Sequence, residues 1–89
     1  MAVREDRQGQ GLSRRLMQAA LALLAAEGVT TVRVATAAAD IGNLRFYQRL
    51  GFRMLRIERD SFTPEGGYPA GLSVRGVPVR DRVWLEMPL

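Results

Sequence analysis

The stretch QGQGLS, Gln8 to Ser13, places two glycines directly ahead of a run of residues with helical spacing. The free backbone amides at the start of a helix can surround an anion, and glycine lets the backbone approach that anion closely. The helix dipole alone contributes only about 0.3–1 kcal/mol near the surface, so binding needs several amides together. The stretch therefore predicts a turn suited to a phosphate group, although such turns are also common as purely structural features.

The residues themselves exclude several better-known kinds of site. A dinucleotide-binding motif G-x-G-x-x-G that began at Gly9 would need a third glycine where the chain has Arg14. All 13 basic residues are arginine, so no lysine is present for a phosphate loop or a Schiff base. The chain has neither cysteine nor histidine, which excludes disulfides, thiolate zinc sites and Ser-His-Asp triads. We expect no metal site, and any chemistry must come from carboxylates, hydroxyls, tyrosine or backbone amides.

The formal net charge of +4 is carried by arginines scattered from Arg4 to Arg82. This distribution suits ligands that bear phosphate, but it is too diffuse to identify a nucleic acid as the partner. An arginine-rich nucleic-acid-binding module therefore remains a weak alternative beside an ordinary solvated basic surface.

The twin arginines Arg14 and Arg15, followed by an alanine- and leucine-rich run, resemble part of an export signal. Glu5 and Asp6 stand where such a signal needs positive charge, and Gln18 interrupts the apolar run. That run is also about half as long as the ~20 apolar residues of a membrane span. We expect a cytoplasmic protein without membrane contact.

The elements that must position these residues fit a single domain of alternating helices and strands. Gly28 is expected to end the first helix, and Asp40 to cap a second one that Gly51 ends. A helix followed directly by a strand implies a parallel crossover, for which only Met1 to Val3 remain as a preceding strand. The expected elements are a helix over 12–27, a strand over 29–36, a helix over 41–50, a half-buried strand over 52–59, a long loop or irregular hairpin over 60–81, and a last strand over 83–89. The apolar stripe of the first helix is expected to consist of Leu12, Leu16, Ala20, Leu23 and Leu24. In the second helix, Phe46 and Leu50 are expected in the core.

Two segments together resemble the GCN5-related N-acetyltransferase (GNAT) family. QGQGLS is similar to the family's Q/R-x-x-G-x-G/A motif for acyl-CoA, with Ser13 in place of the final small residue. NLRFYQRLGF, Asn43 to Phe52, resembles the segment that these enzymes carry on the helix after the next strand. The resemblance implies an α/β fold with a mixed sheet, and of that fold the C-terminal half: a strand stub, a helix, a strand, a helix and two antiparallel strands.

The resemblance also implies acetyl-CoA as co-substrate and an amine as acceptor. In the family, amides of the first motif hold the pyrophosphate, and a tyrosine at the position of Tyr47 acts as general acid toward the departing thiolate; the alternative is that Tyr47 only packs its ring. Arg7 and Arg15 are further candidates for screening phosphate charge, and Asp40 stands where the family often has asparagine. The residues expected to contact the cofactor are Ala2, Val3, Gln8, Gly9, Gln10, Gly11, Leu12, Ser13, Arg14, Asp40 and Asn43.

The strands that precede the first motif in the family have no counterpart here, and they frequently carry the general base. No match to the family's motifs assigns the role of general base to Glu5, Asp6 or Glu58. We expect either a fragment of a longer acetyltransferase or a half-domain that completes its sheet through self-association or a partner chain. A non-catalytic acyl-CoA-binding module is the main alternative function.

Overall fold

The computed structural model describes residues 10–89, which fall into two compact units. One unit comprises the residues up to Val32 together with Pro88 and Leu89, and the other runs from Arg33 to Met87. The predicted strand stub with Ala2 and Val3, and the first residues of the glycine stretch, Gln8 and Gly9, lie outside the described residues.

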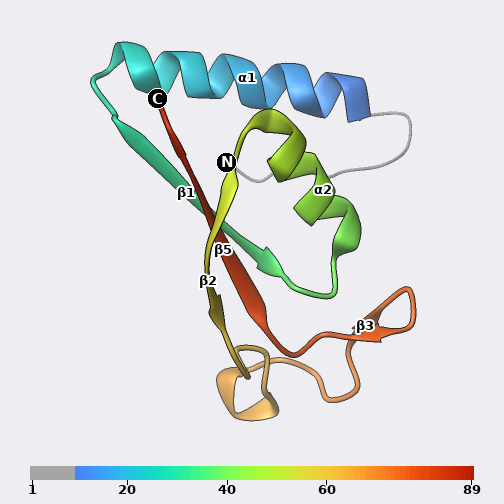
Figure 1. Cartoon of the computed structure of the whole chain (residues 1–89). Coiled ribbons are helices and arrows are strands. Elements are labelled where there is room, and N and C mark those ends of the chain that lie inside the picture. The colour runs from blue at the N-terminus through green and yellow to red at the C-terminus, as the bar shows by residue number, and fades with distance from the viewer. Residues whose placement is uncertain (1–9) are drawn as a thin grey trace. The chain divides into compact units, whose positions relative to one another are not determined.

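The first unit contains helix α1, Gln10–Ala26, drawn in blue to cyan in Figure 1. It ends as predicted at Gly28, whose φ of 92° is a left-handed conformation that glycine adopts without strain. The amide of Val29 donates to the carbonyl of Leu24 at 3.0 Å, and the amide of Gly28 donates to Ala25 at 3.1 Å, so two carbonyls of the last turn are paired. Neither helix in residues 10–89 has the length and apolar content to cross a membrane.

The buried face of α1 differs from the predicted apolar stripe. Ser13, Met17 and Leu21 are buried, whereas Leu12, Leu16 and Leu23 are 62%, 46% and 67% exposed. Each of the three buried residues directly follows a residue of the predicted stripe, which corresponds to a rotation of about 100° about the helix axis. The prediction of the buried face was wrong because leucine and alanine occur on several sides of this helix, so their spacing does not indicate which side is buried.

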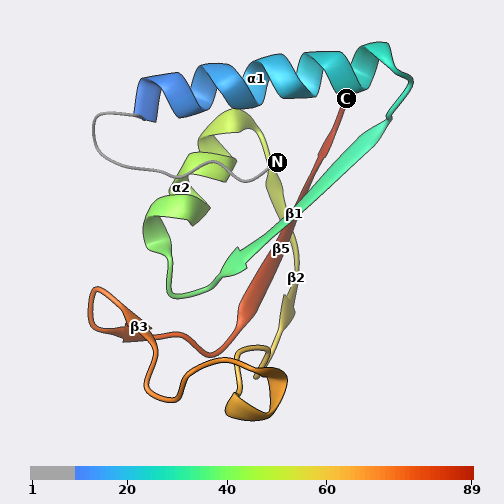
Figure 2. The same ribbon diagram turned by 180° about the vertical axis from the view of Figure 1, so that it is seen from behind.

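The second unit is built on a three-stranded sheet in the order β1-β5-β2 (Figures 1 and 2). Its strands are β1 at Thr31–Ala37, β2 at Arg53–Glu58 and β5 at Arg82–Pro88. The predicted antiparallel pairing of the last two strands is confirmed by the register of β2 on β5. The buried apolar residues of this unit are Ala39, Phe52, Val79, Val83 and Leu85.

Helix α2, Ile41–Leu50, connects β1 to β2 and has the predicted bounds. The side chain of Asp40 accepts a hydrogen bond from the backbone amide of Asn43, which satisfies one of the unpaired donors of the first turn. At the other end Gly51 has a φ of 114°, and the amide of Phe52 donates to the carbonyl of Tyr47 at 3.0 Å. Both helices therefore end with a glycine followed by an apolar residue whose amide bonds back to the helix.

Two predictions about burial in the second unit were wrong. Helix α2 contains no buried residue, because Phe46 and Leu50 are only half-covered and the fully covered aromatic ring is that of Phe52, just after the helix. Strand β2 is exposed along Arg53 to Ile57 instead of half-buried. The register on β5 shifts at Leu55, and this bulge interrupts the alternation of side chains between the two faces on which the prediction relied.

The segment between β2 and β5 forms an irregular hairpin, one of the two predicted forms. A short 3-10 helix η1, Pro64–Gly66, is followed by the paired strands β3, Ser73–Val74, and β4, Val77–Pro78. Arg75 and Gly76 connect β3 to β4 with φ values of 48° and 82°. Positive φ at both central residues is typical of the tight turns that match the twist of a β-hairpin.

Candidate functional site

The first predicted motif leads directly into the N-terminus of α1. The helix begins at Gln10, so Gly11, Leu12 and Ser13 lie in its first turn, which carries no acidic residue. The first backbone amides of a helix have no acceptor inside it and carry partial positive charge. Because Arg14 adds a full positive charge at an exposed position in the next turn, this end of α1 favours an anion. The residues present therefore fit a phosphate-bearing group such as the pyrophosphate of coenzyme A.

Asp40 and Asn43 meet at the start of α2. Besides the cap that Asp40 provides, the side-chain amide of Asn43 donates to Thr36 Oγ1 at 3.3 Å. These bonds connect the end of β1 to the first turn of α2. The carboxylate of Asp40 is already engaged in capping the helix, whereas the amide oxygen of Asn43 accepts no hydrogen bond within residues 10–89.

Tyr47 lies in the middle of α2 between two other aromatic rings. Its ring meets Phe46 at a centroid distance of 5.6 Å and Phe52 at 5.4 Å, both in edge-to-face arrangements. Such pairs add about 0.5–1.5 kcal/mol each beyond the area they bury. The ring is therefore held in one place by its two aromatic neighbours.

The second unit brings Asp40, Asn43 and Tyr47 together on one helix, while Gln10 to Arg14 belong to the first unit. No three histidine, cysteine, aspartate or glutamate residues in the described part of the chain lie close enough to hold a metal ion.

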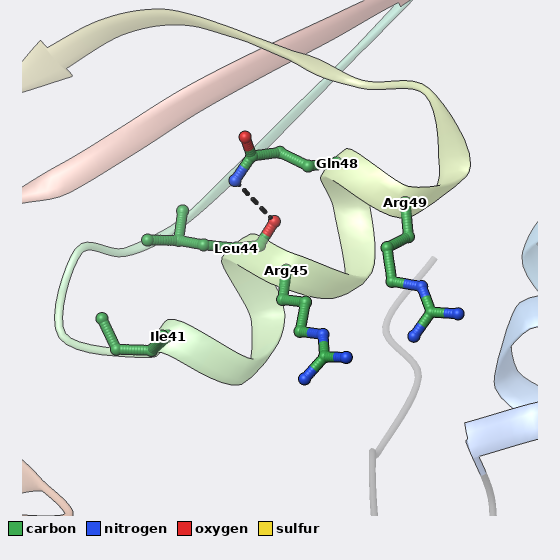
Figure 3. Close-up of a pocket in the computed structure, with 5 residues that line it drawn as sticks. All are labelled: Ile41, Leu44, Arg45, Gln48 and Arg49. Carbon is green, nitrogen blue, oxygen red and sulfur yellow. Dashed lines mark hydrogen bonds between the residues drawn. The ribbon is translucent and has the colours of Figure 1, made fainter.

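The sequence interpretation missed a pair of arginines on the outer face of α2. The two arginines belong to an open hollow of about 420 Å³ on this helix (Figure 3). The residues that line it recur at helical spacing and are Ile41, Leu44, Arg45, Gln48 and Arg49. Figure 3 shows the side chains of Arg45 and Arg49 on the same side of the helix, while the amide of Gln48 donates back to the carbonyl of Leu44 at 3.1 Å. The four-residue spacing of the two arginines was visible in the sequence and could have revealed the pair.

A second group missed by sequence reasoning joins β5 to the end of β2 and to the irregular hairpin. Arg82 donates to Glu58 at 3.2 Å and to the hydroxyl of Tyr68 at 3.3 Å, and its guanidinium lies 4.9 Å from the ring centre of Phe62. The hydroxyl of Ser61 also donates to Glu58, at 2.7 Å. These contacts come from residues up to 24 positions apart, so no local pattern could indicate them.

Comparison with known proteins places these features in a family. The model of the acetyltransferase (GNAT) family matches residues 1–52, more than half of the chain. This chain belongs to the GNAT acetyltransferase family. Both the predicted family and the predicted mixed α/β fold of its C-terminal half are confirmed.

Individual GNAT relatives agree with this assignment. The chain is 30% identical over its 89 residues to an uncharacterized N-acetyltransferase of Bacillus subtilis, of which it covers 56%. Among solved structures, 99% of the chain matches an IAA acetyltransferase from Bacillus cereus at 31% identity and a TM-score of 0.84, covering 57% of that protein. The same share matches a GNAT acetyltransferase from Elizabethkingia anophelis with acetyl-CoA bound, at 27% identity and a TM-score of 0.83, covering 56% of it. A Bacillus subtilis acetyltransferase in complex with CoA matches over 99% of the chain and 57% of its own length, at 31% identity and a TM-score of 0.84.

The chain thus spans about half the length of the GNAT relatives it matches.

Proposed function

We propose that this chain is the acetyl-CoA-binding part of an N-acetyltransferase that transfers an acetyl group to an amine. One observation carries the proposal: the helix that follows the glycine motif begins inside that motif, at Gln10, with no acidic residue in its first turn. An anion that approaches this end meets free amides and no opposing carboxylate. Two structural relatives that contain CoA or acetyl-CoA support the choice of ligand.

The pyrophosphate would be held by the backbone around the start of α1, from Gln8 to Ser13, with Arg14 screening its charge. In the second unit, the amide oxygen of Asn43 would accept a hydrogen bond from an amide of the pantetheine arm. The part of Asp40 would be indirect, because its carboxylate already caps the helix that carries Asn43. Ala2 and Val3 would form the strand that contacts the same arm.

Acetyl-CoA supplies the acetyl group as a thioester. In the transfer the amine nitrogen forms a bond to the acetyl carbon, the bond from that carbon to sulfur breaks, and the amine gives one proton to a base, directly or through water. Tyr47 would donate its phenolic proton to the departing thiolate, because phenols and thiols are weak acids of comparable strength. The aromatic contacts of Tyr47 would keep its hydroxyl in place for this step.

The partner of this chain would be a further segment or copy that pairs with β1. In residues 10–89, β1 has a neighbouring strand on one side only, and an unpaired strand edge presents backbone donors and acceptors to another strand. Light scattering coupled to size exclusion tests this idea, because a stable monomer without a partner would contradict it.

The ligand is tested by thermal-shift titration of the full chain. Saturating acetyl-CoA should raise the melting temperature, whereas adenosine and duplex DNA should not, because neither presents a pyrophosphate to a helix N-terminus. Stabilisation by DNA alone would instead favour the nucleic-acid alternative. Turnover with a panel of amines then separates an enzyme from a module that only binds acyl-CoA.

Gly11→Glu is the matching variant, because it places a carboxylate and a side chain in the first turn of α1. It should abolish the shift with acetyl-CoA, since charge and close approach would both be wrong. Ala22→Glu adds the same charge at an exposed position farther along α1 and should leave the shift unchanged. Unchanged acetyl-CoA binding in Gly11→Glu would refute this position of the pyrophosphate.

A further inference from the structure

The bulge at Leu55 brings two arginines of β2 to the same face of the sheet. Side chains alternate between the two faces of a strand, so residues three positions apart ordinarily point to opposite faces. In the register of β2 on β5, however, Arg53 lies opposite Glu86 and Arg56 lies opposite Trp84. Glu86 and Trp84 are two positions apart on β5 and share a face, so the two arginines share it as well.

This face of the sheet has an excess of positive charge. We call it the arginine face, and it consists of Arg33, Arg53, Arg56, Glu58, Arg82, Trp84 and Glu86. Arg33 reaches it from β1 by pairing with Glu86 at 3.4 Å, and its side chain is 64% exposed. Arg56, at 56% exposure, lies 3.9 Å from Glu58. Because four arginines stand against two glutamates, two positive charges remain unbalanced on this side of the second unit.

Trp84 adds an aromatic ring to the arginine face. The guanidinium of Arg56 lies 5.1 Å from the centre of this ring, within the range of a cation–π contact. Trp84 is half-buried and its Nε1 is covered, so it offers a ligand ring surface rather than its N–H group. Nucleobases stack on aromatic rings and on guanidinium planes. The layer formed by Arg56 and Trp84 is therefore suited to stacking with an unpaired base.

The combination of stacked groups and positive charge distinguishes between possible occupants. An acidic peptide would pair with the arginines, but its carboxylates would leave the ring unused. The bases of a duplex present only their edges, in the grooves. A second copy of the chain would place one excess of positive charge against another. A single-stranded nucleic acid supplies both phosphates for the arginines and exposed base faces for the ring.

We propose that the arginine face binds single-stranded nucleic acid. A base stacks on Arg56 and Trp84, and neighbouring phosphates pair with Arg33 and Arg53. The ion pair of Arg33 with Glu86 does not prevent this, because exposed ion pairs contribute little to stability. All of these residues belong to the second unit, and the site does not depend on acetyl transfer.

The test uses Trp84 as its reporter, since it is the only tryptophan of the chain. The full chain is titrated with an oligouridylate of about 12 nucleotides, and quenching of the tryptophan fluorescence gives the dissociation constant. A plot of the logarithm of the binding constant against that of the salt concentration should have a slope of about −1.4, because each of two phosphate contacts contributes about −0.7. An RNA duplex of the same length should bind about tenfold more weakly.

Two double variants separate the arginine face from the net charge of the chain. Arg33→Gln, Arg53→Gln should weaken binding of the oligouridylate about tenfold and bring the salt slope close to zero. The control Arg45→Gln, Arg49→Gln removes the same charge from exposed positions on α2 and should keep both affinity and slope.

The ring is tested with a labelled oligouridylate, because substitution of Trp84 removes the reporter. Fluorescence anisotropy should show about tenfold weaker binding for Trp84→Leu and nearly unchanged binding for Trp84→Phe, which keeps a ring for stacking. Quenching in the wild-type chain tests the same contact without any substitution.

Several outcomes would overturn the proposal. Absence of quenching and of binding by anisotropy is one, and equal affinity for the duplex is another. Unchanged affinity in Arg33→Gln, Arg53→Gln, or an equal loss in the α2 control, would also overturn it, since the latter indicates only a general effect of net charge. Equally tight binding of oligoglutamate would instead identify an acidic peptide as the partner. None of these results depends on acetyl-CoA, so the proposed function is tested separately.

Discussion

The carboxylate of Asp40 accepts a hydrogen bond from the backbone amide of Asn43 at 3.1 Å and so caps the helix that carries Tyr47. Asp40→Ala should lower the free energy of unfolding by about 1 kcal/mol, because a donor of the first turn loses its acceptor. Asp40→Asn should stay near the wild type, since asparagine caps helices about as well. Urea denaturation followed by circular dichroism measures both. An equal loss in the two variants would mean that capping is not the function of this side chain.

The orientation of α1 can be tested with two neighbouring residues. Met17 is 6% exposed and Leu16 is 46% exposed, so Met17→Ala should cost about 2–4 kcal/mol and Leu16→Ala at most about 1 kcal/mol. The comparison is direct because both changes remove a large apolar side chain from the same helix. Chemical denaturation of the two variants gives the values. The opposite ranking would support the stripe that the sequence pattern predicted.

Arg82 of β5 contacts the irregular hairpin at Tyr68 and Phe62, and it also pairs with Glu58 at the end of β2. Its side chain is 27% exposed, and Arg82→Gln should cost about 1–2 kcal/mol and speed amide hydrogen exchange over residues 60–81. The matched control is Arg33→Gln, which breaks a pair with Glu86 in which the arginine side chain is 64% exposed. That variant should change stability by less than about 0.5 kcal/mol. Unaltered exchange in Arg82→Gln would show that other contacts hold the hairpin.

Tyr47→Phe separates the hydroxyl from the ring. The ring contacts with Phe46 and Phe52 remain, so the affinity for acetyl-CoA should stay nearly constant while acetyl transfer falls about 100-fold. The chain offers a control in its other tyrosine, because Tyr68→Phe removes a hydroxyl that contacts Arg82 and should leave transfer unchanged. Turnover and binding are measured on the same preparations. Equal loss of affinity and turnover in Tyr47→Phe would indicate a packing role.

Local chemistry made much of this fold predictable. Asp40 and Gly51 bound α2 as expected, since capping and the left-handed turn depend on neighbouring residues alone. The helix face that is buried, by contrast, depends on what lies around α1, and a helix with leucines on several sides does not encode that. The exposure of β2 was likewise hidden, because alternation of apolar and charged residues reveals neither a bulge nor what covers each face of a strand.

The candidate site likewise contains residues that the sequence could indicate and residues that only the structure brings together. Gly11, Asn43 and Tyr47 could be proposed from the sequence because they lie in two motifs that resemble those of the family. The contacts of Arg82 join distant positions and could be seen only in three dimensions. Arg45 and Arg49 lay inside a recognised motif, but the hollow that they line together with Ile41 and Leu44 could be seen only in three dimensions.

The bulge at Leu55 bears on how such a chain can assemble. A fibre grows by strand pairing only if every molecule has two unpaired strand edges, because each copy must pair with one neighbour on either side. In the three-stranded sheet, the β2 edge is bent by the bulge and carries Arg53 and Arg56, both of which disfavour pairing, so the outer edge of β1 is the one left for another strand. In the proposed association through the sheet, growth would therefore end once two β1 edges meet, at a closed pair.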